Sequence, residues 1–303
     1  MASLEPVFIA GPTAAGKSEL ALLLAEQIGG EIISVDSMQV YRGMDIGTAK
    51  PSAEERRRVR HHLIDVAEIN EAFDAAQFAR LANQAVGEIA SRRRVPIFCG
   101  GTGLYFRAYT EGLGDAPSAN RAIREELQKL PLETLLLELQ EKDPETFDRI
   151  DRQNPRRVVR AVEVIRLTGK PFSVQRGEWA STGSGPPTNF FVIRRDTADL
   201  RARIDLRVDW MFRAGLVEET RALLETGLEK NITAMQAIGY RQVVEHLGGE
   251  RTLAETIDLV KIRTRQFAKR QMTWFKRQPG AQWLDWTSGT EATELLAKLL
   301  KGL

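Results

Sequence analysis

The segment GPTAAGKSEL, residues 11–20, has residue types and spacing suited to holding a phosphate group. Gly11, Gly16, Lys17 and Ser18 match the pattern G-x-x-x-x-G-K-[ST]. Glycines let the backbone curl so that its N–H groups point at an anion, and a following helix adds the positive end of its dipole. Lys17 would form an ion pair with a terminal phosphate, and the Ser18 hydroxyl can hold Mg²⁺. We therefore predict a phosphate-binding loop made of Gly11, Pro12, Thr13, Ala14, Ala15, Gly16, Lys17 and Ser18.

A second chemical group, Asp36, comes at the end of the apolar run EIISVDS, residues 31–37. Nucleotide hydrolases usually carry an acid at the end of a later buried strand, where it holds Mg²⁺. The candidate strand VPIFCGGTG, residues 95–103, has no acid. In a parallel sheet the carboxyl ends of the strands form the ligand crevice, so we predict that Asp36 and Lys17 face the same cleft.

The elements that would position these groups alternate between strand and helix. Short apolar runs at 7–10, 31–37 and 95–101 predict buried strands, and helical patterns follow at 17–27, from Asp74 to Arg92, and after residue 102. Further strands are predicted at 190–196 and 282–286, with helices at 199–215 and 253–278 and at the C-terminus. This pattern predicts an α/β fold, a P-loop-type parallel sheet flanked by helices.

The pattern changes between residues 114 and 170, where helical segments follow one another with no strand between them. The Asn154–Pro155 pair there is typical of a helix cap followed by a first-turn proline. We predict a helical insertion domain at 114–170 and a catalytic core formed by 1–113 and 171–303. A Gly/Ser/Pro-rich stretch at 177–189 is predicted to be a mobile loop.

Charge is unevenly distributed, although the net charge is only +2. From Lys261 to Arg277 there are seven basic residues and no acidic ones, and arginines also cluster at 154–160 and 192–196. Such clustering suggests a polyanionic partner. The single cysteine excludes an internal disulfide, and no apolar run is long enough for a membrane helix or a signal peptide, so we expect a cytoplasmic protein with no membrane partner.

Several motifs, in order, carry a family resemblance. The stretch DSMQVYRGMDIGTAKP (36–51), together with GPTAAGKS, HHLID (61–65), GGTGLY (100–105), NPRRVVRA (154–161) and AIGYRQ (237–242), resembles the tRNA dimethylallyltransferases, also called tRNA isopentenyltransferases. The resemblance covers nearly the whole chain and fits the compact bacterial form. It implies Mg²⁺-dependent transfer of a dimethylallyl group from dimethylallyl diphosphate to the exocyclic N6 amine of the adenosine immediately 3′ of the anticodon. It also implies that the loop holds the diphosphate of the donor and not ATP.

The resemblance assigns roles to individual residues. Asp36 is expected to be the general base, and Lys17 and Thr102 are expected in the catalytic site. Arg203 resembles the family arginine that reaches the diphosphate from the far side, with Arg207 one helical turn later. Contacts to tRNA are expected at Asp36, Ser37, Met38, Gln39, Thr102, Arg124, Arg156, Arg157, Val158, Val159, Arg160, Gln236, Ala237, Ile238, Gly239, Tyr240 and Arg241.

The basic run at 261–277 would add contacts to RNA phosphates that do not depend on sequence, with Lys261, Arg265 and Lys269 on one helix face. We expect a monomer.

Three other functions remain open from the residues alone. An adenylate isopentenyltransferase would share the loop and Asp36 but has no need of the helical insertion or the arginine-rich surfaces. A P-loop kinase for a small metabolite would consume ATP and release ADP. An RNA-binding module with a nucleotide switch would bind RNA in a nucleotide-dependent way and tolerate loss of Asp36.

Overall fold

The computed structural model describes residues 5–112, 117, 120–176 and 187–303. The chain divides into two compact units, the first made of residues 1–109 and 185–303 and the second of residues 110–184. Residues 177–186 of the predicted mobile loop lie outside the described part of the chain.

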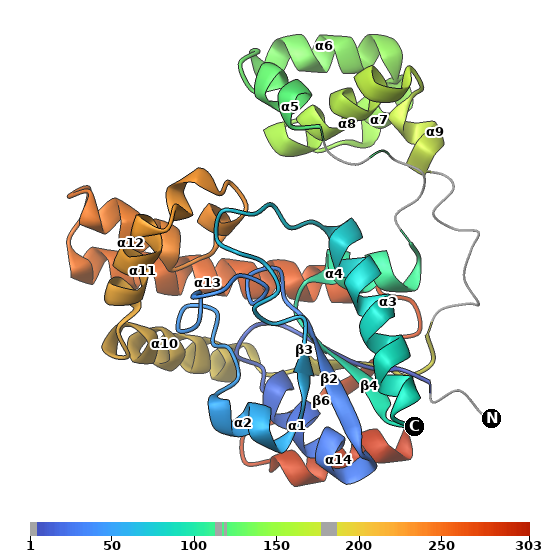
Figure 1. The fold of residues 1–303 in the computed structure, drawn as a ribbon, viewed down its shortest axis with the longest axis vertical. Helices are drawn as coiled ribbons and strands as arrows, with labels where there is room; N and C mark the ends of the chain where they lie inside the picture. The colour runs from blue at the N-terminus through green and yellow to red at the C-terminus, as the bar shows by residue number, and fades with distance from the viewer. Residues whose placement is uncertain (1–4, 113–116, 118–119, 177–186) are drawn as a thin grey trace. The chain divides into compact units, whose positions relative to one another are not determined.

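The first unit is built on a sheet in which every pair of neighbouring strands is parallel, as predicted (Figure 1). The strand order is β3-β2-β4-β1-β5-β6, so the strand that precedes the phosphate loop lies inside the sheet. The strands are β1 (Val7–Ala10), β2 (Gly30–Val35), β3 (His61–His62), β4 (Val95–Gly100), β5 (Phe190–Arg194) and β6 (Gln282–Asp285).

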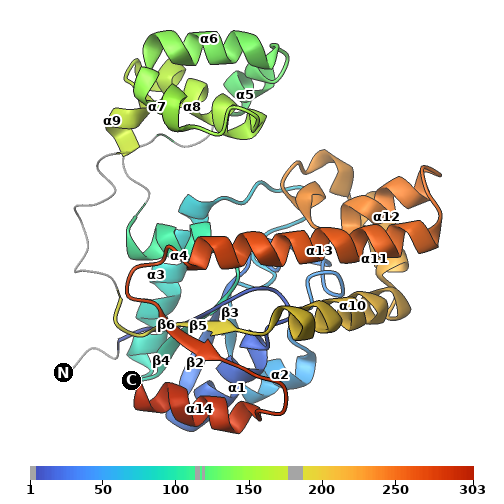
Figure 2. The same cartoon turned by 180° about the vertical axis from the view of Figure 1, so that it is seen from behind.

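Helices cover both faces of this sheet (Figures 1 and 2). Alternate residues of β1 enter different cores: Val7 and Ile9 pack with α1 (Lys17–Ile28) and α14 (Ala292–Lys301), whereas Phe8 and Ala10 pack with helices of the opposite face. That opposite face is covered by α3 (Ala75–Ser91), α4 (Gly103–Thr110) and the end of α13 (Leu253–Phe275). Strands buried on both faces need continuous apolar sequence, which is what the runs VFIA and PIFC provide.

Most of the remaining helices of the first unit surround the carboxyl ends of the strands. Helix α13 packs along α10 and also contacts α12, and α11 packs on α12 (Figure 2). These elements are α10 (Thr197–Arg213), α11 (Leu216–Glu225), the 3₁₀ turns η2 (Leu228–Lys230) and η3 (Ala234–Gln236), and α12 (Tyr240–Leu247). Helix α2 (Ala53–Arg58) instead lies beside α1, where Arg58 pairs with Glu26.

Helix boundaries follow the capping signals in the sequence. Asp74 caps α3 by accepting hydrogen bonds from the N–H groups of Ala76 and Gln77, each at 2.9 Å. Gly29 ends α1 in the left-handed conformation, two residues after the helical pattern predicted at 17–27.

Strand β3 is an element that the sequence pattern does not predict. It is two residues long, and His62 Nε2 lies 2.7 Å from Glu31 of β2, which Arg92 also contacts. Hydrogen bonds from Arg92 and His62 outweigh the effect of burial and lower the pKa of Glu31 to about 2. The histidine therefore belongs to a hydrogen-bonded cluster at the edge of the sheet.

The second unit is helical, with α5 (Arg121–Leu127), α6 (Leu132–Lys142), α7 (Pro144–Arg149), α8 (Pro155–Thr168) and α9 (Phe172–Arg176). Helix α8 begins as predicted: Asn154 accepts a hydrogen bond from the Arg157 N–H, and Pro155 occupies the first turn. The core of the second unit is formed by Leu135, Leu139, Val158, Val162 and Ile165, among others. Among the described residues, none of the helices is both long enough and apolar enough to span a membrane.

Candidate active site

The phosphate loop, residues 11–18, connects β1 to α1. Gly16 caps α1 in the left-handed region at φ +100°, and a Cβ at this position would lie 2.5 Å from the Trp286 ring. Only glycine combines that backbone with that contact. Lys17 follows in the first turn, and its Nζ donates a hydrogen bond to the Pro12 carbonyl at 2.7 Å, which curls the lysine over the loop.

A cavity of about 90 Å³ opens beside this loop. Since one buried water needs roughly 10–15 Å³ by this measure, the space accommodates a group much larger than a single water. Its walls come from the phosphate loop, the ends of β2 and β4, the segment after β2, and helices α10 and α13. They are Thr13, Lys17, Ser18, Asp36, Gln39, Thr48, Ala49, Cys99, Gly100, Gly101, Arg207, Phe267 and Gln271.

Asp36 lies on this cavity with Lys17, as the strand topology predicts. Its Oδ1 accepts hydrogen bonds from the N–H groups of Met38 at 2.8 Å and Gln39 at 3.3 Å. No residue in the described part of the chain donates to Oδ2. Thr102 supports the same turn, because its Oγ1 accepts from the Ser37 N–H at 3.1 Å. One carboxylate oxygen thus fixes the turn while the other is left for a ligand.

The electrostatics of the cavity favour an anionic ligand. The pKa of the Lys17 ammonium is lowered to about 8, chiefly by burial; the nearby Arg207 charge acts in the same direction, while the Asp36 carboxylate acts in the opposite one. Burial likewise lowers the pKa of the Arg207 guanidinium. A bound diphosphate would supply the negative charge that two partly desolvated cations need.

Arg203 and Arg207 of α10 take different positions. Arg207 lines the cavity, with its Nη2 3.5 Å from the Thr48 carbonyl. Arg203 does not line it; its Nε donates to the Ala14 carbonyl at 2.9 Å, on the phosphate loop itself. The geometry therefore favours Arg207 for contact with a ligand in the cavity, one turn from the residue that the sequence analysis favoured.

Gln271 of α13 is a site residue that the sequence analysis missed. Its Oε1 accepts from the Thr13 N–H at 2.8 Å and its Nε2 donates to the Gly101 carbonyl at 3.0 Å, so one buried amide joins the phosphate loop to the end of β4. A signal was present: Ala268, Gln271 and Phe275 follow helical spacing and are all buried. A polar residue on an apolar stripe needs a buried partner.

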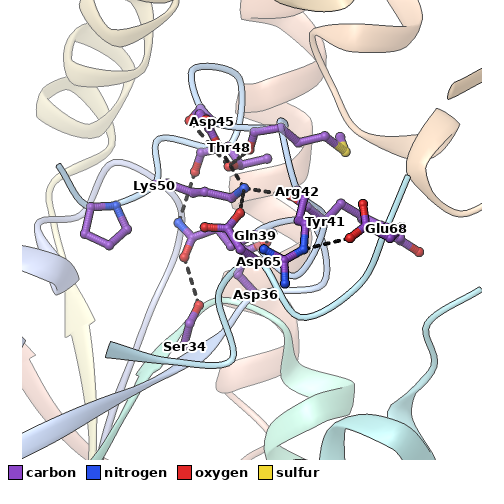
Figure 3. A network of polar contacts seen from close by, with 12 residues as sticks. Ser34, Asp36, Gln39, Tyr41, Arg42, Asp45, Thr48, Lys50, Asp65 and Glu68 are labelled. Atoms are coloured by element: carbon purple, nitrogen blue, oxygen red, sulfur yellow. Dashed lines mark hydrogen bonds and ion pairs between the residues drawn. The ribbon is translucent and has the colours of Figure 1, made fainter. Parts of the chain in front are cut away.

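The segment after β2 is held by a polar network (Figure 3). Lys50, whose side chain is 2% exposed, donates to the Tyr41 carbonyl at 2.6 Å, to Asp45 at 2.7 Å and to Asp65 at 2.5 Å. Gln39 Nε2 donates to the carbonyls of Thr48 and Ala49 at 3.2 and 3.3 Å. This network folds residues 36–50 back on themselves, which places Asp36, Gln39 and Thr48 on one cavity.

The basic run of α13 is only partly available to a ligand. Lys261 pairs with Asp209 at 2.6 Å, and Arg265 Nε lies 2.9 Å from Asp205, both carboxylates belonging to α10. Lys269, which the sequence analysis places on the same face, is exposed. The other exposed basic residues of the run are Arg263, Arg270, Lys276 and Arg277.

The predicted RNA-contacting segment at residues 236–241 divides into buried and exposed side chains. Ala237 and Tyr240 are buried, and Tyr240 donates its hydroxyl to Glu219 at 2.5 Å. Gln236 and Arg241 are exposed, and Arg241 also pairs with Glu245. Direct contact with a large ligand through the Tyr240 side chain is therefore excluded in this conformation.

In the second unit the predicted RNA contacts divide in the same way. Val158 and Val159 are buried in the core of the unit. Arg124 and Arg160 both donate to Glu163, which is completely buried and also accepts from the Asn120 N–H. Arg156 and Arg157 are exposed. The side chains that stabilise the unit itself are therefore those of Val158, Val159, Arg124 and Arg160.

Replacing Glu163 with glutamine should destabilise the second unit by about 2 kcal/mol, because the two arginines lose their counter-charge. A fully buried pair would cost more, but the Arg124 side chain is 40% exposed. Hydrogen bonds from Arg160 and Arg124 outweigh burial and lower the pKa of Glu163. Its stabilisation is therefore present above the unfolded pKa and lost as the pH falls through the folded value. Urea unfolding measures both effects; equal stability of Glu163→Gln and the exposed-site control Glu133→Gln would contradict the assignment.

Together, the fold and the cavity define an α/β protein of the P-loop type in which Lys17, Arg207 and Asp36 line one cavity beside the loop. A family model described as IPP transferase matches residues 39–278 of the chain. The chain therefore belongs to the IPP transferase family.

Curated relatives and solved structures agree with this assignment. The chain is 47% identical over 280 residues to tRNA dimethylallyltransferase 1 of Trichlorobacter lovleyi, covering 91% of this chain and 92% of the relative. It is 45% identical over 292 residues to tRNA dimethylallyltransferase 1 of Citrifermentans bemidjiense, covering 96% and 95%.

The crystal structure of the tRNA isopentenylpyrophosphate transferase of Bacillus halodurans superimposes with a TM-score of 0.72 at 38% identity, covering 98% of this chain and 95% of that one. A eukaryotic dimethylallyltransferase acting on tRNA superimposes with a TM-score of 0.79 at 28% identity, covering 94% and 75%.

Proposed function

We propose that this protein is a tRNA dimethylallyltransferase, which transfers the dimethylallyl group of dimethylallyl diphosphate to the N6 amine of the adenosine immediately 3′ of the anticodon. The observation that carries this proposal is that Asp36, Lys17 and Arg207 all line one cavity. A diphosphate bound by the cations would place its attached carbon next to a carboxylate with one unused oxygen.

The proposed reaction forms one bond and breaks one. The N6 nitrogen attacks the first carbon of the donor, the new C–N bond forms, and the bond from that carbon to the diphosphate oxygen breaks. Asp36 Oδ2 accepts the proton that leaves the amine. Lys17, Arg207 and the N–H groups of the loop stabilise the charge that develops on the departing pyrophosphate.

The donor set fits Mg²⁺ as a further component. The exposed Ser18 hydroxyl and Asp36 line the cavity, and Mg²⁺ prefers oxygen ligands, taking one or two from the protein and the others from water and substrate phosphates. Ser18 would hold the ion together with the diphosphate, and the ion would neutralise charge on the leaving group.

For tRNA, we propose that the exposed basic residues carry the contacts to phosphates. These are Arg156 and Arg157 of the second unit, together with Arg263, Lys269, Arg270, Lys276 and Arg277 of the basic run. Neutralising phosphates releases counterions, so tRNA affinity should fall steeply with salt concentration. We further propose that the enzyme is cytoplasmic and acts as a monomer. Light scattering measures the oligomeric state.

A competition between acceptors tests the proposed function. The protein is incubated with dimethylallyl diphosphate, Mg²⁺, an anticodon stem-loop with adenosine 3′ of the anticodon, and equimolar AMP and ATP. Mass spectrometry should find the five-carbon group on the stem-loop alone. Label on AMP or ATP would assign an adenylate isopentenyltransferase, and ADP without label would assign a kinase.

The ionisation of Lys17 predicts the pH dependence of donor use. With a lysine pKa of about 8 in the free protein, kcat/KM for the donor should be flat below pH 8 and fall by roughly tenfold per pH unit above it. Because the Asp36 charge raises the lysine pKa, residual activity of an Asp36→Asn variant should begin to fall at lower pH. A profile flat to pH 10 would contradict a lysine with a lowered pKa.

A further inference from the structure

Glu219 of α11 receives an unusual number of donors from a distant part of the chain. Its carboxylate accepts from the N–H groups of three consecutive residues, Asp45 at 3.2 Å, Ile46 at 2.9 Å and Gly47 at 3.4 Å. Successive N–H groups converging on one anion form a backbone nest. The nest lies within the segment that follows β2, so one carboxylate fixes the conformation of that segment.

Tyr240 completes this arrangement from α12. Its hydroxyl donates to Glu219 at 2.5 Å and accepts from the Gly47 N–H at 3.1 Å. The side chain is fully buried, and burial together with the Glu219 charge raises its pKa, so the hydroxyl remains a neutral donor. The contact is also close: a Cβ at Gly47 would lie 2.4 Å from the Tyr240 ring.

The segment held in this way continues directly into the wall of the cavity. Thr48 and Ala49 follow Gly47, and both line the cavity beside Asp36. Their carbonyls accept from Gln39 Nε2, and the Thr48 carbonyl also lies 3.5 Å from Arg207 Nη2. A shift of residues 45–47 would therefore move the groups that surround Asp36 and Arg207.

We propose that Glu219 and Tyr240 are positioning residues that set the cavity wall at Thr48 and Ala49, and with it the orientation of Asp36 and Gln39 toward the acceptor base. This inference rests on the proposed function. Neither side chain lines the cavity, so both act through the backbone of residues 45–49. The predicted consequence is a loss of turnover with little change in donor binding, because Gln271 and Arg203 hold the phosphate loop separately. Arg207 is carried by α10, outside the segment, and contacts it only at 3.5 Å.

Two conservative variants, Tyr240→Phe and Glu219→Gln, test the proposal beside matched controls. Glu218→Gln removes the same charge one residue away on an exposed position, and Tyr109→Phe removes a hydroxyl from a tyrosine that packs against Phe8 and Phe98 of the sheet. For Tyr240→Phe we expect kcat with the anticodon stem-loop to fall about tenfold, the size of one or two hydrogen bonds, and Glu219→Gln to lose more. KM for dimethylallyl diphosphate should stay within about twofold of the wild-type value.

Hydrogen–deuterium exchange of peptides covering residues 44–50 supplies a readout independent of activity. Both variants should exchange faster there, while peptides covering the phosphate loop stay unchanged. Wild-type kcat in folded Tyr240→Phe, or unaltered exchange at 44–50, would overturn the positioning role. If the variants exchange faster at residues 44–50 but the wild-type protein labels only AMP, tRNA as the acceptor would be overturned. The positioning role of Glu219 and Tyr240 would still stand.

Discussion

Replacing Lys17 with methionine should weaken binding of dimethylallyl diphosphate at least about a hundredfold, since a partly buried cation is lost from the diphosphate. Mg²⁺ and the loop N–H groups remain, so the variant keeps some affinity. Isothermal titration with the donor measures the loss. Binding of tRNA should be unchanged, and weaker tRNA binding would show that the loop serves RNA phosphates.

The same substitution should stabilise the empty protein by about 2 kcal/mol. The lysine pKa falls from 10.5 in the unfolded chain to about 8 in the folded one, so the folded state binds fewer protons between these values. Stability therefore rises with pH through that interval, and at pH 7 the full cost of the desolvated ammonium is present. The lost hydrogen bond to Pro12 reduces the gain. Denaturation that shows Lys17→Met to be less stable than wild type would contradict this account.

Replacing Asp36 with asparagine should lower kcat by about 10²- to 10⁴-fold, the range expected for removing a general base. Asparagine retains an Oδ1 that accepts from the N–H groups of Met38 and Gln39, so the turn should survive. Affinity for the stem-loop should therefore stay within about threefold, as measured by fluorescence anisotropy. Single-turnover kinetics separate the chemical step from binding.

A matched control is Asp74→Asn, which alters an aspartate with the same hydrogen-bonding role at the start of α3, away from the cavity. It should leave kcat unchanged, because asparagine is also a good helix cap. Full activity of Asp36→Asn would exclude the general-base role. Equal losses in both variants would indicate a structural effect.

Much of the candidate site could be predicted because it depends on local sequence. The phosphate loop needs glycines at fixed positions after a strand, and Lys17 and Ser18 must follow in the first turn of the helix. The prediction that Asp36 would meet Lys17 required one more rule, that parallel strands end at the same edge of the sheet. Both residues line the same cavity in the structure.

Other residues could not be placed from sequence because their neighbours are distant along the chain. Tyr240 lies in a motif that resembles an RNA contact, yet its hydroxyl meets Glu219 and Gly47. Lys261 and Arg265 have the spacing of a basic surface, yet both pair with carboxylates of α10. Gln271 meets Thr13, 258 residues earlier.

The sequence by itself determined the alternation of strands and helices and the phosphate loop, because short-range periodicity and capping fix both. It also determined the meeting of Asp36 with Lys17, because parallel strands end at the same edge of the sheet. The tertiary structure decided which turn of α10 faces the cavity. Arg203 and Arg207 lie on one stripe of that helix, so periodicity treats them alike. The axial position of α10 against the phosphate loop decides the outcome: Arg203 donates to the Ala14 carbonyl, and Arg207 lines the cavity.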